Sequence, residues 1–123
     1  MSRQQDEADL EAVEASYLGN GGEFLLGFLE ERLVARGGYR VRSAGVAELR
    51  RMRIVRELQG QGYGGQLLKE LEQRAFRAGF RAVWLETAKR RPLTLEFYRK
   101  HGYRESGQGF YGVVETVQFE KAL

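Results

Sequence analysis

Cysteine is absent from the sequence, and proline and histidine occur once each. Without cysteine the chain has no disulfide bond, no thiolate metal site and no cysteine nucleophile. The one histidine, His101, lies near the end of a short predicted helix, where we expect it to act as a cap and not as a catalyst. We therefore expect no bound metal and no acyl intermediate on a thiolate.

Long apolar segments are also missing. The longest runs from Phe24 to Leu29 and includes Gly27, so it is far too short to span a bilayer. Residues 1–15 are polar and acidic, unlike a signal peptide or a transit peptide. These observations predict a soluble cytoplasmic protein with no membrane partner.

The charge is nearly balanced, with a formal net charge of +3 over 123 residues. Basic residues nevertheless gather in three clusters, which suit an anionic ligand. The clusters are Arg50, Arg51, Arg53 and Arg56; Lys89, Arg90 and Arg91; and Arg99, Lys100 and Arg104. No RNP, KH or helix-turn-helix signature accompanies them, so nucleic acid is not an expected partner. The length is that of one domain, over residues 1–123.

The periodicity of apolar residues predicts an α/β protein of the α+β type. A helix is expected over residues 7–18, with Leu10, Val13, Tyr17 and Leu18 on one face. An antiparallel meander of three strands follows, then a parallel strand–helix–strand unit, a short helix that begins at Pro92, and two terminal strands. The predicted strands are 24–31, 33–42, 47–55, 82–87, 103–105 and 113–120, and residues 106–112 are expected to form the loop between the last two.

The most informative segment is rich in glycine. Residues 59–65 read Gln-Gly-Gln-Gly-Tyr-Gly-Gly and connect a charged strand to an amphipathic helix. Glycine lets successive backbone N–H groups turn toward one point, and a helix N-terminus adds partial positive charge. Such a loop lies at the carboxyl end of its strand, where ligands bind in parallel units. The segment therefore predicts a site for the diphosphate of a cofactor.

Three kinds of phosphate loop compete for this segment. Gly60, Gly62 and Gly65 satisfy G-x-G-x-x-G, and Glu86 follows at about the distance of a ribose-binding acid. That fingerprint turns tightly off an apolar strand, whereas here residues 56–59 intervene and the strand is highly charged. A Walker-type loop needs a Lys-Ser or Lys-Thr pair after the glycines, which is missing.

The third kind fits the sequence better. Gln59-x-x-Gly62-x-Gly64 resembles the acetyl-CoA pyrophosphate motif of the GNAT superfamily of N-acetyltransferases. Residues 95–103, Leu-Glu-Phe-Tyr-Arg-Lys-His-Gly-Tyr, are similar to the second landmark of that family, a short helix with a Phe-Tyr pair followed by Gly-aromatic. The resemblance extends from about Gly22 to Leu123, in the family's order and spacing.

The resemblance implies that acetyl-CoA is the co-substrate. Backbone N–H groups of the glycine-rich loop would bind its pyrophosphate, and the main chain of the preceding strand would pair with its pantetheine arm. Arg91 replaces an asparagine that is common in the family and could meet a CoA phosphate. The cofactor-binding residues expected on this basis are Met52, Arg53, Ile54, Gln59, Gly60, Gln61, Gly62, Tyr63, Gly64, Gly65 and Arg91.

The resemblance also implies two catalytic residues. Tyr98, the tyrosine of the Phe-Tyr pair, would protonate the departing thiolate of CoA. Glu48 matches a position where some members hold a glutamate base, and strand alternation predicts that it points where Met52 and Ile54 point. Glu86, at the end of the neighbouring strand, is a second candidate for the base. The acceptor would be a small-molecule or peptide amine that attacks acetyl-CoA directly in a ternary complex, with a non-catalytic acyl-CoA-binding or interaction module as the alternative.

Comparison with full members of the family implies a shortened amino terminus. They open with a strand and one or two helices before the meander, and nothing before Phe24 is predicted to replace the first strand and helix. The strand over residues 24–29 would then lie at the edge of the sheet without cover. We therefore expect a homodimer that buries this edge.

Overall fold

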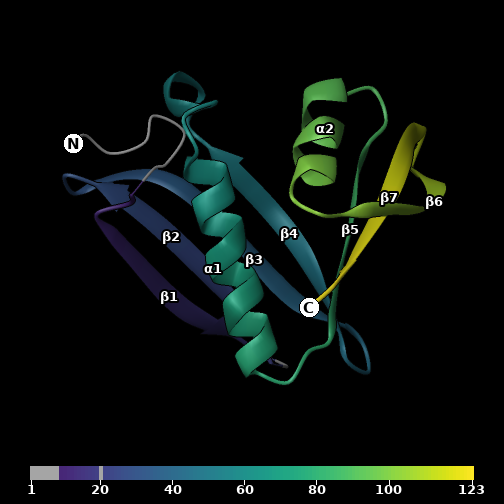
Figure 1. Cartoon of the computed structure of the whole chain (residues 1–123), viewed down its shortest axis with the longest axis horizontal. Helices are drawn as coiled ribbons and strands as arrows, with labels where there is room; N and C mark the ends of the chain where they lie inside the picture. Colours follow the sequence, from purple (N-terminus) through teal and green to yellow (C-terminus); the bar gives the residue numbers. More distant parts are fainter. Residues whose placement is uncertain (1–8, 20) are drawn as a thin grey trace.

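The computed structural model describes residues 9–19 and 21–123, which form a seven-stranded mixed sheet, two α-helices and one short 3₁₀ helix (Figure 1). The strands lie in the order β1-β2-β3-β4-β5-β7-β6. Their bounds are β1 Ala12–Leu18, β2 Gly22–Leu29, β3 Arg32–Ser43, β4 Val46–Ile54, β5 Ala82–Ala88, β6 Arg104–Tyr111 and β7 Val114–Ala122. The helices are η1 Arg56–Leu58, α1 Tyr63–Arg77 and α2 Pro92–Lys100.

The predicted fold class is confirmed. Strands β2, β3 and β4 pair antiparallel as the predicted meander, and β4, α1 and β5 form the parallel unit. Pairing between β4 and β5 covers only residues 46–48 and 82–84, and ends at the pair Glu48 and Trp84. Beyond this pair the two strands diverge toward the end of the sheet at which α1 begins (Figure 1).

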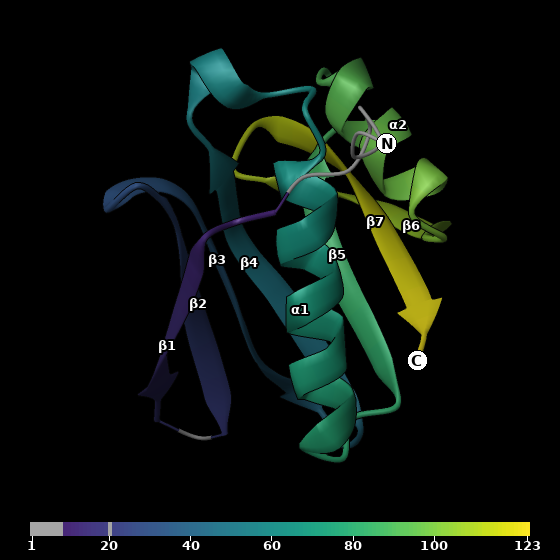
Figure 2. The same ribbon diagram turned by 60° about the vertical axis from the view of Figure 1, so that its left-hand side comes forward.

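Both helices pack on one face of the sheet, as Figures 1 and 2 show. The apolar stripe of α1 and the buried residues of α2 meet the sheet in one continuous core. This core includes Leu67, Leu68, Leu71 and Ala75 from α1, Leu95 and Tyr98 from α2, and Leu25, Val83, Leu85 and Phe119 from the sheet. No helix of the described residues is both long enough and apolar enough to span a bilayer.

The opposite face of the sheet carries no helix of the described residues. Trp84 lies on this face, because its neighbours Val83 and Leu85 belong to the core and side chains alternate along a strand. It is still only 7% exposed. The guanidinium carbon of Arg42 lies 3.4 Å from the centroid of the Trp84 ring and covers it.

The predicted helix over residues 7–18 is wrong for the described part of that segment. Residues 12–18 form β1, which pairs antiparallel with β2 from Ala12 opposite Phe28 to Leu18 opposite Gly22. Residues 7 and 8 lie outside the described residues. Leu10 and Val13 do contact the core, as the apolar spacing suggested, but the main chain of β2 offers hydrogen bonds that decide the conformation.

Strand β1 also corrects the prediction that residues 24–29 lie at an uncovered edge. β2 is paired on both sides, and β1 is the edge strand. Leu10, just before β1, is fixed as well, because its backbone N–H donates to the Gln66 side chain on α1 at 2.8 Å. Leu10 fits because Gly27 has no side chain: a Cβ there would lie 2.6 Å from Leu10 Cδ1.

The loop predicted over residues 106–112 is largely strand. Residues 106–111 belong to β6 and pair with β7, so that only a tight turn around Gly112 connects the two strands. The sequence of this segment is rich in glycine, which is typical of loops. Pairing with β7 overrides that local tendency, with one irregularity between Glu105 and Gly107.

Candidate active site

The glycine-rich segment forms a compact turn between β4 and α1. Residues 56–58 make the 3₁₀ turn η1, and Gly60 and Gly62 follow with φ of 82° and 94°. Both values lie in the left-handed region that favours glycine. The Gln59 side chain donates from Nε2 to the carbonyl oxygen of Ile54 at 3.0 Å, which ties the turn to the end of the strand. Gln61 Nε2 makes a longer contact of 3.5 Å with the carbonyl oxygen of Glu57.

The first turn of α1 presents backbone donors for which the described residues supply no acceptor. Gly62 is the N-cap residue without a side-chain cap, and the first intrahelical bond runs from Gln66 N to Gly62 O at 3.1 Å. The N–H groups of Gly62, Tyr63, Gly64 and Gly65 therefore precede the intrahelical bonding pattern, as in any helix N-terminus. Four donors together with the helix dipole form a cradle for an anion.

Two of the glycines serve a second purpose, because they allow α1 to approach β4 and α2 closely. A Cβ at Gly64 would lie 3.3 Å from the Phe97 ring and 3.6 Å from Ile54 Cγ1. A Cβ at Gly65 would lie 2.7 Å from His101 Nε2. The predicted cofactor-binding segment thus meets the end of β4 and the Phe-Tyr helix at one place. The sequence did not reveal this packing role.

His101 occupies the cap position that was predicted for it. It occupies the C-cap position of α2, its Nδ1 lies 2.8 Å from the carbonyl oxygen of Phe97, and its ring stacks on Phe97 with centroids 4.4 Å apart.

Strand β4 contains an irregularity that alternation did not predict. Arg51 has φ of 59°, and the register with β3 shifts between the pairs Arg36–Arg53 and Gly38–Arg50. The extra residue reverses the alternation, as in a β-bulge. Ala47 and Leu49 face the core before the bulge, and Met52 and Ile54 pack against the same core after it.

The bulge corrects the predicted orientation of Glu48. Its side chain does not point where Met52 and Ile54 point, but to the helix-free face, beside Trp84. There Glu48 Oε1 accepts a hydrogen bond from Arg40 Nε at 3.2 Å, and its side chain is 16% exposed. Glu48 is therefore the cross-strand partner of an arginine and lies next to the last paired position of β4 and β5.

The main chain of β4 beyond Glu48 is paired on one side only. β3 binds it through residues such as Arg36 and Ala35, whereas no described strand pairs with Met52, Arg53 or Ile54 on the side of β5. An unpaired strand edge can add an extended segment through main-chain hydrogen bonds. The diverging strands therefore leave an edge open next to the anion cradle.

Tyr98 lies between α2 and the sheet. Its ring is 8% exposed and packs edge-on against Tyr103 and tilted against Phe119, with centroids 5.6 and 6.1 Å away. Its hydroxyl makes no hydrogen bond with the described residues. Every fully enclosed side-chain nitrogen or oxygen among these residues has a partner, so the Tyr98 hydroxyl is not fully enclosed and is accessible. Burial raises the pKa of Tyr98 to about 12, so that the phenol is protonated at neutral pH.

The remaining candidates are more peripheral. Arg91 is the exposed N-cap residue of α2. Glu86 lies on the helix-free face and accepts hydrogen bonds from two side chains of β7, Thr116 and Gln118.

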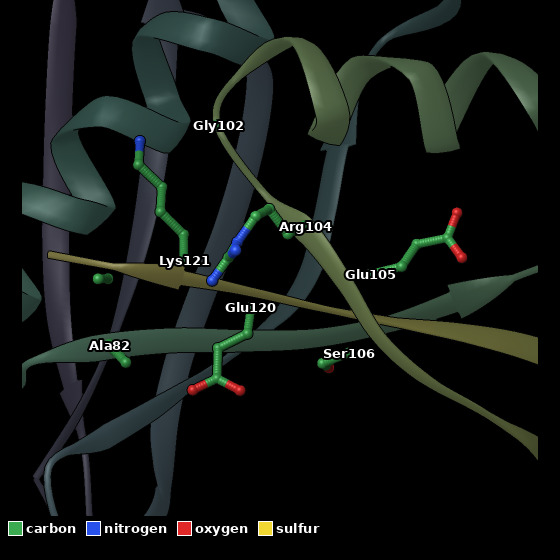
Figure 3. A pocket seen from close by; sticks show the side chains of 8 residues that line it. Ala82, Gly102, Arg104, Glu105, Ser106, Glu120 and Lys121 are labelled. Carbon is green, nitrogen blue, oxygen red and sulfur yellow. The ribbon is translucent and has the colours of Figure 1, made fainter.

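A shallow hollow of about 710 Å³ lies elsewhere, at the beginning of β5 and the end of β7 (Figure 3). Figure 3 shows Lys121 and Glu120 projecting to opposite sides of β7. Lys121 Nζ is already bound to Glu72 Oε1 at 3.0 Å and to the carbonyl oxygen of His101 at 2.9 Å. Because none of the predicted site residues lines this hollow, it is not the candidate active site.

The fold occurs in solved acetyltransferases. A GNAT family acetyltransferase from Elizabethkingia anophelis, crystallised with acetyl-CoA, matches with a TM-score of 0.81 and 15% identity over 91% of this chain and 97% of that one. An acetyltransferase of the GNAT family from Staphylococcus aureus matches with a TM-score of 0.78 and 19% identity over 86% of this chain and 71% of that one. An IAA acetyltransferase from Bacillus cereus matches with a TM-score of 0.77 and 19% identity over 83% of this chain and 78% of that one. Among curated proteins none matches this sequence.

At the sequence level, the family model described as "Acetyltransferase (GNAT) family" matches residues 2–103. The match includes the glycine-rich turn, the bulged strand before it and the Phe-Tyr helix after it. The chain therefore belongs to the GNAT family of acetyltransferases, as the resemblance of its motifs implied.

Proposed function

We propose that the protein transfers the acetyl group of acetyl-CoA to a primary amine. The observation that carries this proposal is the position of the anion cradle at the start of α1, directly beside the open edge of β4. A CoA molecule needs both features, because its pyrophosphate is an anion and its pantetheine arm is an extended chain with amide groups. GNAT enzymes use acetyl-CoA as co-substrate, and the Elizabethkingia structure contains it.

The expected contacts follow from the two features. The N–H groups of Gly62, Tyr63, Gly64 and Gly65 would bind the pyrophosphate, with Gln59, Gly60 and Gln61 shaping the turn. The main chain of Met52, Arg53 and Ile54 would pair with the pantetheine arm. Arg91, at the start of α2, would contribute positive charge for a CoA phosphate.

The transfer step needs a base and an acid. The acceptor arrives as an ammonium, gives one proton to the base, and attacks the thioester carbonyl; a C–N bond forms and the C–S bond breaks. The nitrogen loses its second proton as the amide forms, and this proton replaces the one that Tyr98 gives to the thiolate. Tyr98 supports the second half of the step, because its accessible hydroxyl carries the proton that the thiolate needs. Glu48 is the proposed base on the helix-free face, acting directly or through water. Its ion pair with Arg40 must loosen when it takes the proton.

Replacing Glu48 by glutamine is expected to lower kcat/KM most strongly at pH values above the acidic limb, where the carboxylate is ionised, and so to flatten the acidic limb of the pH–rate profile. The reason is that glutamine keeps the shape of the side chain but cannot accept the proton. Arg40→Gln serves as the control, since it removes the ion pair and leaves the carboxylate. An acidic limb that is unaltered in Glu48→Gln would move the base to Glu86 or to water.

The alternative is a module of the same fold that binds acyl-CoA without turnover. A transfer assay with acetyl-CoA and a panel of amines and lysine-containing peptides separates the two, with release of free CoA thiol as the readout. Acceptor-dependent release supports the enzyme, and CoA binding without release from any acceptor supports the module.

We further propose a homodimer, although its edge differs from the one expected. The exposed edge strand is β1, where Tyr17 and Leu18 are 84% and 46% exposed. An edge strand with exposed apolar side chains favours pairing with a second chain. Light scattering at micromolar concentration is expected to give twice the mass of the chain, and a monomer would contradict this prediction. A cytoplasmic location also stays a prediction.

A further inference from the structure

The carboxylate of Glu86 lies on the helix-free face of the sheet, just beyond the point where β4 and β5 separate. Glu48 and Trp84 are the last paired residues of the two strands, and Glu86 follows Trp84 by two positions on the same face. The carboxylate thus lies on the helix-free face beside the gap between the two strands. Its position therefore suits a residue that receives the acceptor.

Side chains of β7 fix the orientation of this carboxylate. Glu86 Oε2 accepts a hydrogen bond from Thr116 Oγ1 at 2.5 Å and makes a longer contact with Gln118 Nε2 at 3.5 Å. Thr116 is itself buried, with 4% exposure. Within the described residues, no side chain donates to Glu86 Oε1 and no lysine or arginine nitrogen lies within 4.0 Å of either oxygen. The charge of Glu86 is thus oriented but not compensated, in contrast to that of Glu48.

The neighbouring strand leaves the carboxylate open. Gly107 and Gly109 of β6 lie opposite Gln118 and Thr116. A Cβ at Gly109 would lie 3.3 Å from Glu86 Oε2 and 3.1 Å from Gln118 Nε2, and a Cβ at Gly107 would lie 2.7 Å from Gln118 Oε1. Glycine in a strand interior is unfavourable and often marks a close approach. Here the two glycines leave the polar groups of Glu86 and Gln118 uncovered.

We propose that Glu86, oriented by Thr116 and Gln118, binds an ammonium group of the acceptor other than the one that is acetylated. An ammonium has three N–H donors and no acceptor, so the free Oε1 and the side-chain oxygen of Gln118 are complementary to it. A carboxylate on the acceptor would be repelled by Glu86, as like charges are. The preferred acceptors are therefore aliphatic diamines and not amino acids with a free carboxylate. This inference rests on the proposed transfer to an amine.

Initial rates with acetyl-CoA and two acceptors of matched length test the proposal. Both acceptors carry one ammonium group. At the other end of the chain, cadaverine has a second ammonium and 5-aminopentanoate has a carboxylate. The wild type is expected to prefer cadaverine by at least about tenfold in kcat/KM, and Glu86→Gln to raise the KM for cadaverine about 10- to 100-fold. Glu86→Gln should also reduce the preference, while its thermal shift with CoA stays that of the wild type.

Further variants separate binding from general damage. Glu14→Gln makes the same change of charge on the distant strand β1 and should leave all values unchanged. Gly109→Val should also raise the KM for cadaverine, because its side chain covers the carboxylate. Thr116→Val removes the hydroxyl that orients Glu86 and should give an intermediate KM.

The outcomes distinguish this inference from the proposed function. A folded Glu86→Gln that keeps the KM and the preference of the wild type overturns the inference and leaves acetyl transfer standing. A wild type that acetylates other amines but does not prefer cadaverine to 5-aminopentanoate overturns it as well. A wild type that neither binds CoA nor acetylates any amine removes the proposed function, and this inference with it.

Discussion

Replacing Tyr98 by phenylalanine is expected to lower kcat by about 10²- to 10⁴-fold, with little change in the affinity for CoA. The substitution removes one hydroxyl from a ring that is otherwise held by packing. The edge-on contact with Tyr103 and the tilted contact with Phe119 involve the ring alone, so the fold should be kept. Because the hydroxyl makes no hydrogen bond with the described residues, its removal leaves no partner of theirs unsatisfied.

The raised pKa of Tyr98 adds a prediction about pH. A pKa of about 12 keeps the phenol protonated up to about pH 10, so that ionisation of Tyr98 should not reduce the rate of the wild type in the usual assay range. The acid would be lost only as the pH rises through 12. Single-turnover rates of the wild type and of Tyr98→Phe from pH 6 to 10 check both the size of the rate loss in the variant and whether that loss is independent of pH.

Tyr103→Phe is a matched control for this experiment. Tyr103 lies next to Tyr98, but its hydroxyl donates to Glu72 Oε2 at 2.7 Å, so the change should lower the stability and leave kcat largely intact. Unchanged turnover in a folded Tyr98→Phe would return Tyr98 to a packing role and would leave the thiolate to be protonated by water.

Replacing Gly62 by valine is expected to abolish the stabilisation by CoA, which corresponds to a loss of affinity of about 100-fold or more. Gly62 has φ of 94°, and a β-branched residue is a genuine outlier in this region. The chain would have to leave the left-handed conformation, which would turn the N–H groups at the start of α1 away from a common point. The core contacts of α1 begin at Leu67, so the helix itself should form.

Two comparisons sharpen this second experiment. Gly19→Val is the control, since a Cβ added at Gly19 would meet no atom within 4 Å and the residue has no positive φ. Gly64→Val is expected to lose CoA binding too, but with a lower melting temperature, because its side chain would collide with the Phe97 ring. A folded Gly62→Val with the thermal shift of the wild type would contradict the proposed cradle.

Much of the fold could be predicted, because in most segments the local sequence pattern and the tertiary structure favour the same element. In β2 to β5, α1 and α2, apolar periodicity, glycine stops and Pro92 indicated elements that the sheet and core preserve. The errors lie where pairing with a neighbour decides the structure. Residues 12–18 become a strand because β2 offers its main chain, and residues 106–111 because β7 does.

The candidate site shows the same division. The position of the glycine-rich turn follows from its residues, since a positive φ favours glycine at Gly60 and Gly62. The orientation of Glu48 could not be predicted, because the bulge at Arg51 places a positive φ on a residue that gives no signal of it. Likewise, the partners of Glu86 come from β7, about 30 positions away in the sequence.

The most direct test of the proposed CoA site is the thermal stability of the purified protein with CoA and, separately, with NAD. The proposed site predicts that CoA raises the melting temperature in a concentration-dependent way and that NAD does not, because the cradle at Gly62–Gly65 and the open edge of β4 together fit a pyrophosphate followed by an extended pantetheine arm. Stabilisation by NAD alone would contradict it.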